Sequence, residues 1–522
     1  METQNRKDDG ASQLVRLPQR RDLLEQSVLL QLGRRVGRCQ TARPRRTARR
    51  PGALLIALAS LGLTLGAGTV VPAGTSRAGD AGVDWPMYGF NLQRTGENPF
   101  ESVLTPSTVA GLHELWSFDL GAVTIMQPVM ALGVIVDGLP EDLVYIGAEH
   151  GDLYAIDVTS GMMVWQRNLG SQQTGCPDIP DTVFGVSGSP FLDRAFNRMF
   201  VVGGDGNMYA LDLSTGATLP GWPVAVTTEP AWEHTYGAVN VSNGVAYAEI
   251  ASYCDFAPYH GKVVAINIAT HRQVGTFLPA GPNVSGGGIW GPGGVAIDPV
   301  TGHVFTATGN ALTNPESFRY CEDVVELSPS LLVLGANYPG FTGGNVDFGA
   351  TPILYQPPGC PPQVAAKNKT GVLVTYDRGN VAAGPNQRLQ LANVLDYQFN
   401  GIPAWSDMTH LLYISNSSDS LSSRAKHGML AFSVDANCKL HLAWQTTVGP
   451  NLVSVSPPTV AGGVVYYGDG PDSQLLALDA TTGTQLWSSG STIGGGIYAA
   501  PMVVNGRVFV GAWDGKFYAF GL

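Results

Sequence analysis

The stretch GDLYAIDVTSG, residues 151–161, recurs along the chain and decides the fold. Close copies are GNMYALDLSTG from Gly206, GKVVAINIAT from Gly261 and QLLALDATTG from Gln474. Weaker copies begin near Glu322, Gly371 and His427, and a last copy, GKFYAFG from Gly515, ends the sequence. Copies at a regular spacing of roughly 50–60 residues indicate a repeat architecture in which each unit is one supersecondary structure.

Each copy is one strand of a larger unit. Two short apolar runs precede it, such as SGSPFLD and MFVVGGD before Gly206, and a strand with a tryptophan follows it at Trp165, Trp444 and Trp487. The unit is therefore a blade of four antiparallel strands, A to D, whose D-x-x-T-G turn joins C to D. We expect the strand-D tryptophans to pack between neighbouring blades. Eight copies of strand C predict an all-β fold, a single eight-bladed β-propeller over residues 84–522.

The two ends of the repeat region complement each other. The last copy stops after its strand C, whereas LHELWSFDL, residues 112–120, resembles a strand D without strands A to C before it. We expect this N-terminal strand to pair with residues 515–520 and to close the ring, which removes the open sheet edges. The stretch SGGGIWGPGGVAIDPVTGHVFTATGN, residues 285–310, is expected to contain strands A and B of the fourth blade.

The N-terminal region differs in charge from the rest. Residues 1–50 hold 12 Arg and one Lys against five acidic residues, whereas the whole chain has a net charge of −11. The acidic remainder argues against nucleic acid as a partner. This Arg-rich tail precedes an uncharged apolar stretch within residues 51–73, which is typical of an export signal. The stretch is either cleaved or retained as an inner-membrane anchor through residues 53–71, and both alternatives predict a periplasmic or extracellular protein.

The six cysteines of the chain also bear on whether the protein is exported. Cys39 lies in the tail, and the other five follow the apolar stretch without any CxxC or CxxCH motif, so neither a redox dithiol nor covalent haem is expected. Five cysteines in an oxidising compartment predict two disulfides and one free thiol. Cys360, in an A–B loop, and Cys438, in a C–D turn of the next blade, should lie on one face of the ring and form a bridge.

The repeat pattern A-x-D-x-x-T-G-x-x-x-W and the N-terminal motif DWPMYGFN (84–91) with RTG (94–96) resemble those of the PQQ-type quinoprotein propellers. The resemblance covers roughly residues 84–522 and is specific for the fold. It implies either a quinoprotein alcohol dehydrogenase-like oxidoreductase, which uses pyrroloquinoline quinone (PQQ) and calcium, or a non-catalytic envelope scaffold or binding propeller with a decayed cofactor site.

The resemblance also implies a set of site residues. Trp290 stands in the place of the tryptophan on which PQQ stacks, and Asn310 and Glu249 in the places of calcium ligands, with Asp255 as an alternative to Glu249. Asp347 stands in the place of the catalytic aspartate and further metal ligand, although Val346 replaces the usual tryptophan before it. Lys369 stands in the place of the basic residue at the quinone oxygens.

The cysteines depart from the family, in which two adjacent cysteines often cover the cofactor. Here Cys176 and Cys254 lie on loops that should open on the same face, so a bridge between them is expected to cover the pocket, with Cys321 as the alternative partner of Cys254.

The chemistry of this residue set is coherent. PQQ is a flat tricarboxylate that stacks on an indole, and a hard cation takes oxygen ligands. Asp347 would take the alcohol proton, while the metal and Lys369 polarise the quinone. The expected partners are a small-molecule or polymeric alcohol and a separate electron acceptor. Each residue also has an ordinary structural explanation, since Glu249 and Asp347 suit strand ends, Asn310 and Lys369 suit turns, and Trp290 suits packing.

Overall fold

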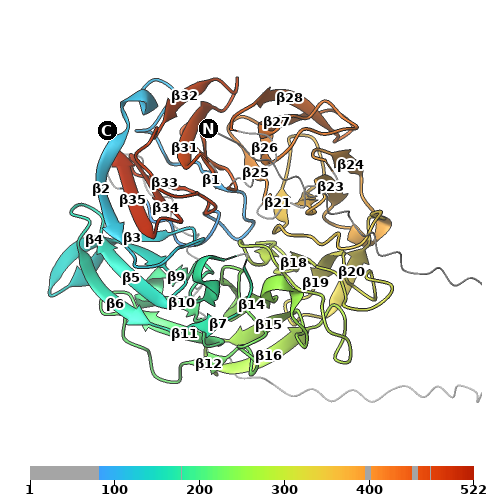
Figure 1. The fold of residues 1–522 in the computed structure, drawn as a ribbon, viewed down its shortest axis with the longest axis horizontal. Coiled ribbons are helices and arrows are strands. Elements are labelled where there is room, and N and C mark those ends of the chain that lie inside the picture. Colours follow the sequence, from blue (N-terminus) through green and yellow to red (C-terminus); the bar gives the residue numbers. More distant parts are fainter. Residues whose placement is uncertain (1–81, 178, 394–400, 450–455, 471) are drawn as a thin grey trace, which may run out of the picture. The chain divides into compact units, whose positions relative to one another are not determined.

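Eight antiparallel sheets stand around a ring in the computed structural model, and each sheet is one copy of the repeat (Figure 1). The structure describes residues 82–522 except residues 178, 394–400, 450–455 and 471. The predicted tail (1–50) and apolar stretch (51–73) lie outside this part. Strands A to D follow the chain order in seven of these sheets, because hairpins join them, whereas the eighth takes its strand D from the N-terminal part of the described chain. The predicted all-β, eight-bladed propeller is confirmed.

The first blade consists of β3 (Val129–Val136), β4 (Leu139–Gly147), β5 (Asp152–Asp157) and β6 (Met163–Asn168), and the second of β9 (Phe191–Asp193), β10 (Arg198–Val202), β11 (Asn207–Asp212) and β12 (Val224–Ala225). The third blade consists of β13 (Asn240–Ser242), β14 (Val245–Ile250), β15 (Lys262–Asn267) and β16 (Arg272–Phe277). The fourth consists of β17 (Ala296–Ile297), β18 (Val304–Ala307), β19 (Val324–Leu327) and β20 (Val333–Asn337). Strands β17 and β18 are the predicted strands A and B of the fourth blade.

The fifth blade consists of β21 (Ile353–Tyr355), β22 (Gln363–Lys367), β23 (Val372–Asp377) and β24 (Gln387–Gln390), and the sixth of β25 (Ala404–Ser406), β26 (Leu411–Asn416), β27 (Gly428–Val434) and β28 (Leu440–Thr446). The seventh blade consists of β29 (Thr459–Ala461), β30 (Val464–Asp469), β31 (Gln474–Asp479) and β32 (Gln485–Ser488). The eighth consists of β33 (Met502–Val504), β34 (Arg507–Gly511), β35 (Lys516–Gly521) and β2 (His113–Asp119). A small hairpin pairs β7 (Gln172–Gln173) with β8 (Val183–Phe184).

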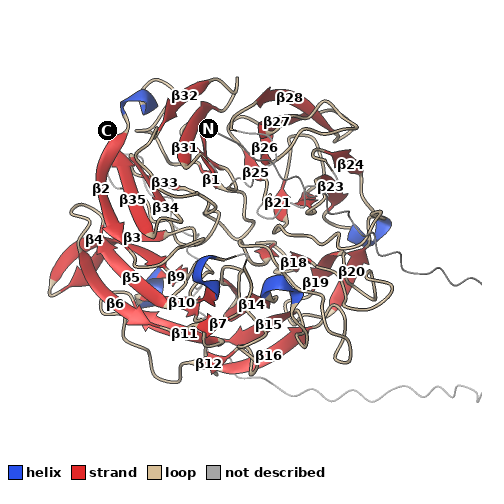
Figure 2. Ribbon diagram, in the orientation of Figure 1, coloured by secondary structure: helices blue, strands red, loops and turns tan. Residues whose placement is uncertain are grey.

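Helix is nearly absent (Figure 2). The described residues contain five short 3₁₀ helices, η1 (Val109–Gly111), η2 (Pro180–Thr182), η3 (Arg194–Phe196), η4 (Tyr253–Asp255) and η5 (Val381–Ala383). Within this part of the chain, no helix is long and apolar enough to cross a membrane.

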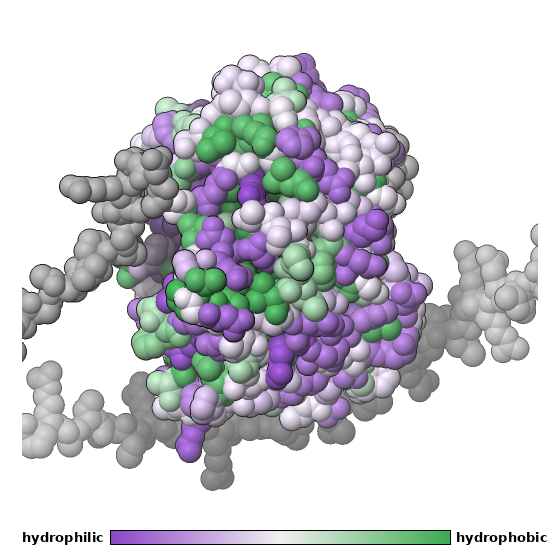
Figure 3. Space-filling view, turned by 90° about the vertical axis from the view of Figure 1, so that its left-hand side faces the viewer, coloured by the Kyte–Doolittle hydropathy of each residue, from purple (hydrophilic) through white to green (hydrophobic). Residues whose placement is uncertain are grey.

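The burial of a strand depends on its place in the blade. Strands B and C lie between neighbouring blades and are buried along most of their length, as in β14 and β30, which explains their continuous apolar runs. The outermost strand D is half exposed, as in β2 and β6. The side of the ring at the left of Figure 1 accordingly mixes hydrophilic and hydrophobic residues (Figure 3).

The N-terminal strand closes the ring as predicted. Strand β2 pairs antiparallel with β35, from His113 opposite Gly521 to Asp119 opposite Lys516. The eighth blade is therefore built from the two ends of the repeat region.

The strand-D tryptophans pack between blades, as expected from their place in the repeat. The indole Nε1 of Trp165 donates a hydrogen bond to Leu213 O of the next blade at 2.9 Å, and that of Trp444 donates to Ala480 O at 3.1 Å. Each indole also lies on the glycine of the next D-x-x-T-G turn, since a Cβ at Gly483 would lie 2.4 Å from Trp444 Cε3. The glycine and the tryptophan of the repeat are thus two halves of one contact between blades.

Residues 85–98, here called the crossing segment, bind the innermost strands of all eight blades. Trp85 pairs with Met130 of the first blade, and Asn98 Nδ2 donates to Val503 O of the eighth at 2.9 Å. Strand β1 (Glu97–Asn98) runs parallel to β29. The partners in the eight blades are Met130, Leu192, Val239, Ile297, Leu354, Trp405, Val460 and Val503. The segment therefore hydrogen-bonds backbone groups that the inner sheet edges would leave unpaired.

Both predicted disulfides are present. Cys360–Cys438 and Cys176–Cys254 each have a Cα–Cα distance of 5.7 Å, within the range that a disulfide allows. Cys321 is the free cysteine of the described residues and is buried.

Candidate functional site

The candidate site lies on the face of the ring that carries the D–A and B–C loops. Its first component is Trp290, in the loop before β17. A Cβ at Gly288 would lie 2.8 Å from the indole Nε1, and one at Gly309 would lie 2.6 Å from the same atom. Gly309 N donates to Gly288 O at 2.6 Å, which joins this loop to the end of β18. The two glycines therefore allow the indole to lie directly on the backbone.

Asp347, in the loop before β21, is the centre of the site. Its carboxylate accepts a hydrogen bond from the backbone N–H of Asn310 and forms an ion pair with Lys369. The backbone O of Asp347 accepts from Lys369 N at 2.9 Å. A Cβ at Gly309 would lie 2.7 Å from Asp347 Oδ1. Trp290, Asn310, Asp347 and Lys369 thus meet around Gly309.

The Asn310 side chain also faces the carboxylate. When its amide is oriented to satisfy both groups, the nitrogen donates to Asp347 Oδ2 at 3.2 Å. Lys369 Nζ donates in addition to the side-chain oxygen of Asn345. All four groups are buried, with Asp347 fully so. The arrangement is a fixed carboxylate between an amide and an ammonium group.

Glu249 has other neighbours. It lies within β14, opposite Val263 of β15, and accepts a hydrogen bond from Thr306 Oγ1 of β18 at 2.6 Å. Burial raises its pKa to about 8, against a smaller opposing effect of Thr306 and the Arg94 charge. The ladder of β14 continues beyond Glu249, so this side chain lies deeper than the B–C loop. The structure therefore places Glu249 between two blades, with its Oε2 buried and without a hydrogen-bond partner among the described residues.

Asp255 lies closer to the centre of the site. Burial, and next the negative charge of Asp347, raise its pKa to about 6. The Tyr259 hydroxyl donates a hydrogen bond to Asp255 Oδ1 at 2.5 Å. Cys254 and Asp255 both have positive φ, 58° and 52°, which side chains other than glycine adopt rarely. The Cys176–Cys254 disulfide and Tyr259 hold this unusual turn in place.

An aromatic group links the disulfide to Trp290. The Tyr236 ring centroid lies 4.4 Å from that of Tyr253, the residue before Cys254, and 5.4 Å from that of Trp290. The sequence reasoning missed Tyr236, because it lies in a D–A loop without any repeat signature. The disulfide thus lies on the same side of the site as Trp290, with Tyr236 between them.

Two further carboxyls near Asp347 were also missed. Burial, followed by the charge of Asp347, raises the pKa of Glu322 to about 7, and the charge of Glu316 acts on both Glu322 and Asp255. Glu322 has a φ of 61° and occupies the repeat position that holds a positive-φ glycine at Gly151 and Gly206. The glutamate at this glycine position of the repeat is visible in the sequence and could have marked Glu322 as a candidate site residue. No three carboxylate, histidine or cysteine side chains of the described residues form a ready metal site.

Known proteins match both the repeats and the fold. A family model described as outer membrane protein assembly factor BamB matches residues 109–276 and 440–521. The chain is similar to a polyvinylalcohol dehydrogenase of Sphingopyxis sp. (strain 113P3), at 23% identity over 439 residues, which cover 71% of this chain and 64% of the relative. It is also similar to a 1-butanol dehydrogenase (cytochrome c) of Thauera butanivorans, at 28% identity over 156 residues, which cover 29% of this chain and 20% of the relative. The chain thus spans less than two thirds of the length of these relatives.

A solved structure shows the same fold. A europium-containing methanol dehydrogenase superposes with a TM-score of 0.64 at 18% identity, over 84% of this chain and 98% of that one. Fold and repeats together define the class, a β-propeller of PQQ-type repeats. Repeats and fold therefore bear out the resemblance of this chain to the PQQ-repeat, quinoprotein alcohol dehydrogenase-like propellers.

Proposed function

We propose that the chain is an exported alcohol dehydrogenase that uses PQQ and a hard cation such as Ca²⁺ and passes electrons to a separate acceptor. The meeting of Trp290, Asn310, Asp347 and Lys369 around Gly309 is the observation that carries the proposal. The names of the two curated relatives, both alcohol dehydrogenases, support it. Two disulfides suit an oxidising compartment and so support export.

The residues present fit the cofactor in their chemistry. The indole of Trp290 offers a surface for a flat ring system, and Lys369 offers positive charge to a tricarboxylate. Asn310, Asp347 and Asp255 offer the oxygen ligands that Ca²⁺ prefers. We assign the third ligand to Asp255 because Tyr259 holds its carboxylate in place and the charge of Asp347 acts on it, whereas Glu249 accepts a hydrogen bond from Thr306 between the blades.

PQQ, when bound, would supply the hydride acceptor, which no side chain can replace. The protein's part is to bind the alcohol and to take up its hydroxyl proton. Asp347 is the group we assign to proton uptake, since it is a buried carboxylate whose oxygens are fixed by Asn310 and Lys369. The Cys176–Cys254 disulfide and Tyr236 would cover the site from the other side and limit the entry of water.

The test is reconstitution of the purified chain with PQQ and Ca²⁺, followed by dye reduction with primary, secondary and polymeric alcohols. We expect turnover with at least one alcohol, and loss of turnover in Asp347→Asn with PQQ still bound, as measured by its absorbance after gel filtration. Trp290→Ala should instead lower the affinity for PQQ. A chain that binds PQQ but oxidises no alcohol of the panel would contradict the proposal.

A second candidate function is a non-catalytic binding or scaffold propeller. The family model supports it, because its description is that of an assembly factor and it matches residues 109–276 and 440–521. This candidate predicts that the chain does not bind PQQ at all. Equilibrium dialysis of PQQ with and without Ca²⁺ therefore distinguishes the two candidates before any activity is measured.

A further inference from the structure

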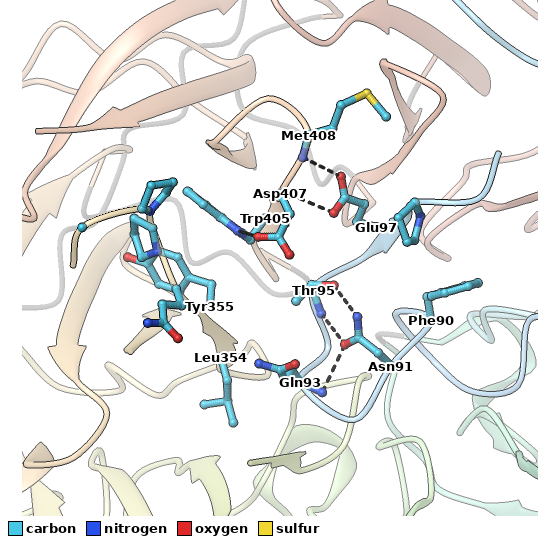
Figure 4. Close-up of a pocket in the computed structure, with 15 residues that line it drawn as sticks. Phe90, Asn91, Gln93, Thr95, Glu97, Leu354, Tyr355, Trp405, Asp407 and Met408 are labelled. Carbon is cyan, nitrogen blue, oxygen red and sulfur yellow. Dashed lines mark hydrogen bonds between the residues drawn. The ribbon is translucent and has the colours of Figure 1, made fainter. Parts of the chain in front are cut away.

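The opposite face of the ring carries a cavity of about 720 Å³, lined by described residues (Figure 4). Its walls are the crossing segment, the A–B loop after β21 and the A–B turn between β25 and β26. The candidate site lies on D–A and B–C loops, at the other end of the same strands. The cavity is therefore separate from the Asp347 site, and its volume lies within the range typical of small-molecule sites.

Two carboxylates from different elements come together in this cavity. Glu97 of the crossing segment accepts a hydrogen bond from Asp407 N at 2.9 Å and another from Ser406 Oγ. Burial raises the pKa of Glu97, and the negative charge of Asp407 adds to the effect. The two groups are thus close enough to repel each other, and a cation placed beside them would relieve that repulsion.

The side chain of Asp407 is fixed by one of its two carboxylate oxygens. Its Oδ1 accepts a hydrogen bond from Trp405 Nε1 at 2.6 Å, which fixes the side chain (Figure 4). The other oxygen, Oδ2, has no hydrogen-bond partner among the described residues. Asp407 itself is exposed, so this oxygen can be reached from solvent.

The remaining walls are apolar or neutral, and a disulfide fixes one of their loops. None of the described residues that line the cavity is Lys, Arg or His. Pro99, Pro358 and the exposed Met408 provide apolar surface at the rim. The Cys360–Cys438 disulfide follows Gly359 directly and fixes the loop that carries Pro358. A site whose walls are fixed before binding loses little conformational entropy when a ligand enters.

We propose that this cavity binds a small organic cation, a primary ammonium group on an apolar stem, with Asp407 as its charge partner. The ammonium group would donate to Asp407 Oδ2 and lie near Glu97, and the stem would pack against Pro99, Pro358 and Met408. The same chemistry is present in a free alkylamine and in a lysine side chain of a peptide. The proposal does not depend on the function of the Asp347 site.

The test is calorimetric titration of the purified chain, without PQQ, with n-hexylammonium chloride and with 1-hexanol as the uncharged analogue. Asp407→Asn is the decisive variant, because it keeps an oxygen for Trp405 and removes the charge. Asp137→Asn, at an exposed turn, is the matched control. We expect hexylammonium to bind, hexanol to bind at least about tenfold more weakly, and only Asp407→Asn to lose about tenfold in affinity. Added salt should weaken the binding.

A third ligand, the peptide acetyl-Gly-Lys-Gly-amide, identifies the source of the cation. Binding equal to that of hexylammonium points to a lysine of a protein partner, and much weaker binding points to a free amine. No binding of hexylammonium, equal binding of hexanol, or an unchanged affinity in a folded Asp407→Asn variant would each overturn the proposal. The melting temperature of each variant shows whether it is folded.

Discussion

Glu322 occupies a backbone conformation that its side chain disfavours. Equivalent positions of the repeat carry glycine at φ of 93° and 78°, whereas Glu322 is held at 61°. Its Oε1 is buried and has no hydrogen-bond partner among the described residues. Strain of this kind persists mostly where a function requires the side chain. Glu322 therefore deserves a test beside Asp347, although no family motif points to it.

We predict that Glu322→Gly raises stability by about 1 kcal/mol, because it removes the disfavoured backbone conformation. The gain should be larger at pH 8 than at pH 5, since the raised pKa of about 7 means that the buried carboxyl is charged only at the higher pH. Denaturant unfolding at both pH values measures this. The control is Gly206→Ala, which should lose stability, because its Cβ would lie 2.7 Å from Thr227 Cγ2.

The identity of the third cation ligand gives another prediction at this scale. Asp255→Asn should lower the affinity for Ca²⁺ in the presence of PQQ by about 10- to 100-fold, while Glu249→Gln should leave it nearly unchanged. Terbium luminescence or calorimetry measures the affinity without any need for turnover. The opposite result, a loss only in Glu249→Gln, would return the ligand role to Glu249.

The elements of the blade are joined by the tryptophan and the glycine of the repeat. Because the Trp444 indole lies on Gly483, the D-x-x-T-G turn of one blade is shaped by strand D of the preceding blade. Each repeat must therefore supply both a turn glycine, which receives the tryptophan of the preceding blade, and a tryptophan of its own, which packs on the next blade. The same pattern joins the eighth blade to the first, where Trp116 Nε1 donates to Val158 O at 3.0 Å and its ring lies on Gly161.

We predict that Gly483→Ala destabilises the propeller by about 2–5 kcal/mol, through its positive φ and its clash with Trp444. Gly490→Ala is a matched control, since Gly490 also has a positive φ but no atom within 4 Å of an added Cβ. It should cost only about 1–2 kcal/mol. Equal losses in the two variants, measured by chemical denaturation, would mean that the indole contact contributes nothing.

The sequence allowed the blades to be predicted because their signals are local. Turn residues and apolar runs within one repeat are enough to define strands A to D. Contacts between distant segments gave no such signal. The crossing segment was seen as a motif, yet its eight partners depend on the assembled ring. Glu249 and Asp255 follow each other across the end of β14, which runs to Ile250, so the strand pattern alone does not choose between them as ligands.

The whole propeller buries several carboxyl groups whose pKa values are raised mainly by desolvation. They are Glu149, Glu322 and Asp323 at about 7, Glu249 at about 8, and Asp255 and Asp469 at about 6. A carboxyl with a folded pKa above its unfolded value binds protons more tightly in the folded state. Its contribution to stability is present below the unfolded pKa and is lost as the pH rises through the folded pKa.

We therefore predict that the melting temperature falls between pH 5 and pH 8 at constant ionic strength. Lys367 has the opposite effect, because burial lowers its pKa to about 7. Its contribution to stability increases as the pH rises through this value, so it opposes the trend only at the upper end of the range. Calorimetric melting across the range tests the sign. A melting temperature that rises steadily toward pH 8 would show that these carboxyls are less buried in solution than in the structure.

The crossing segment also has a consequence for how the chain is made. It is synthesised before every blade that it contacts, and its final hydrogen bond, from Asn98 to Val503, spans 405 positions of the sequence. Contacts of such high order form slowly, because the intervening chain must first come together. During synthesis the backbone groups of the leading end must therefore stay without these partners until the trailing end has been made. We expect resistance to proteases to appear in one late step after release of the complete polypeptide, and not one blade at a time.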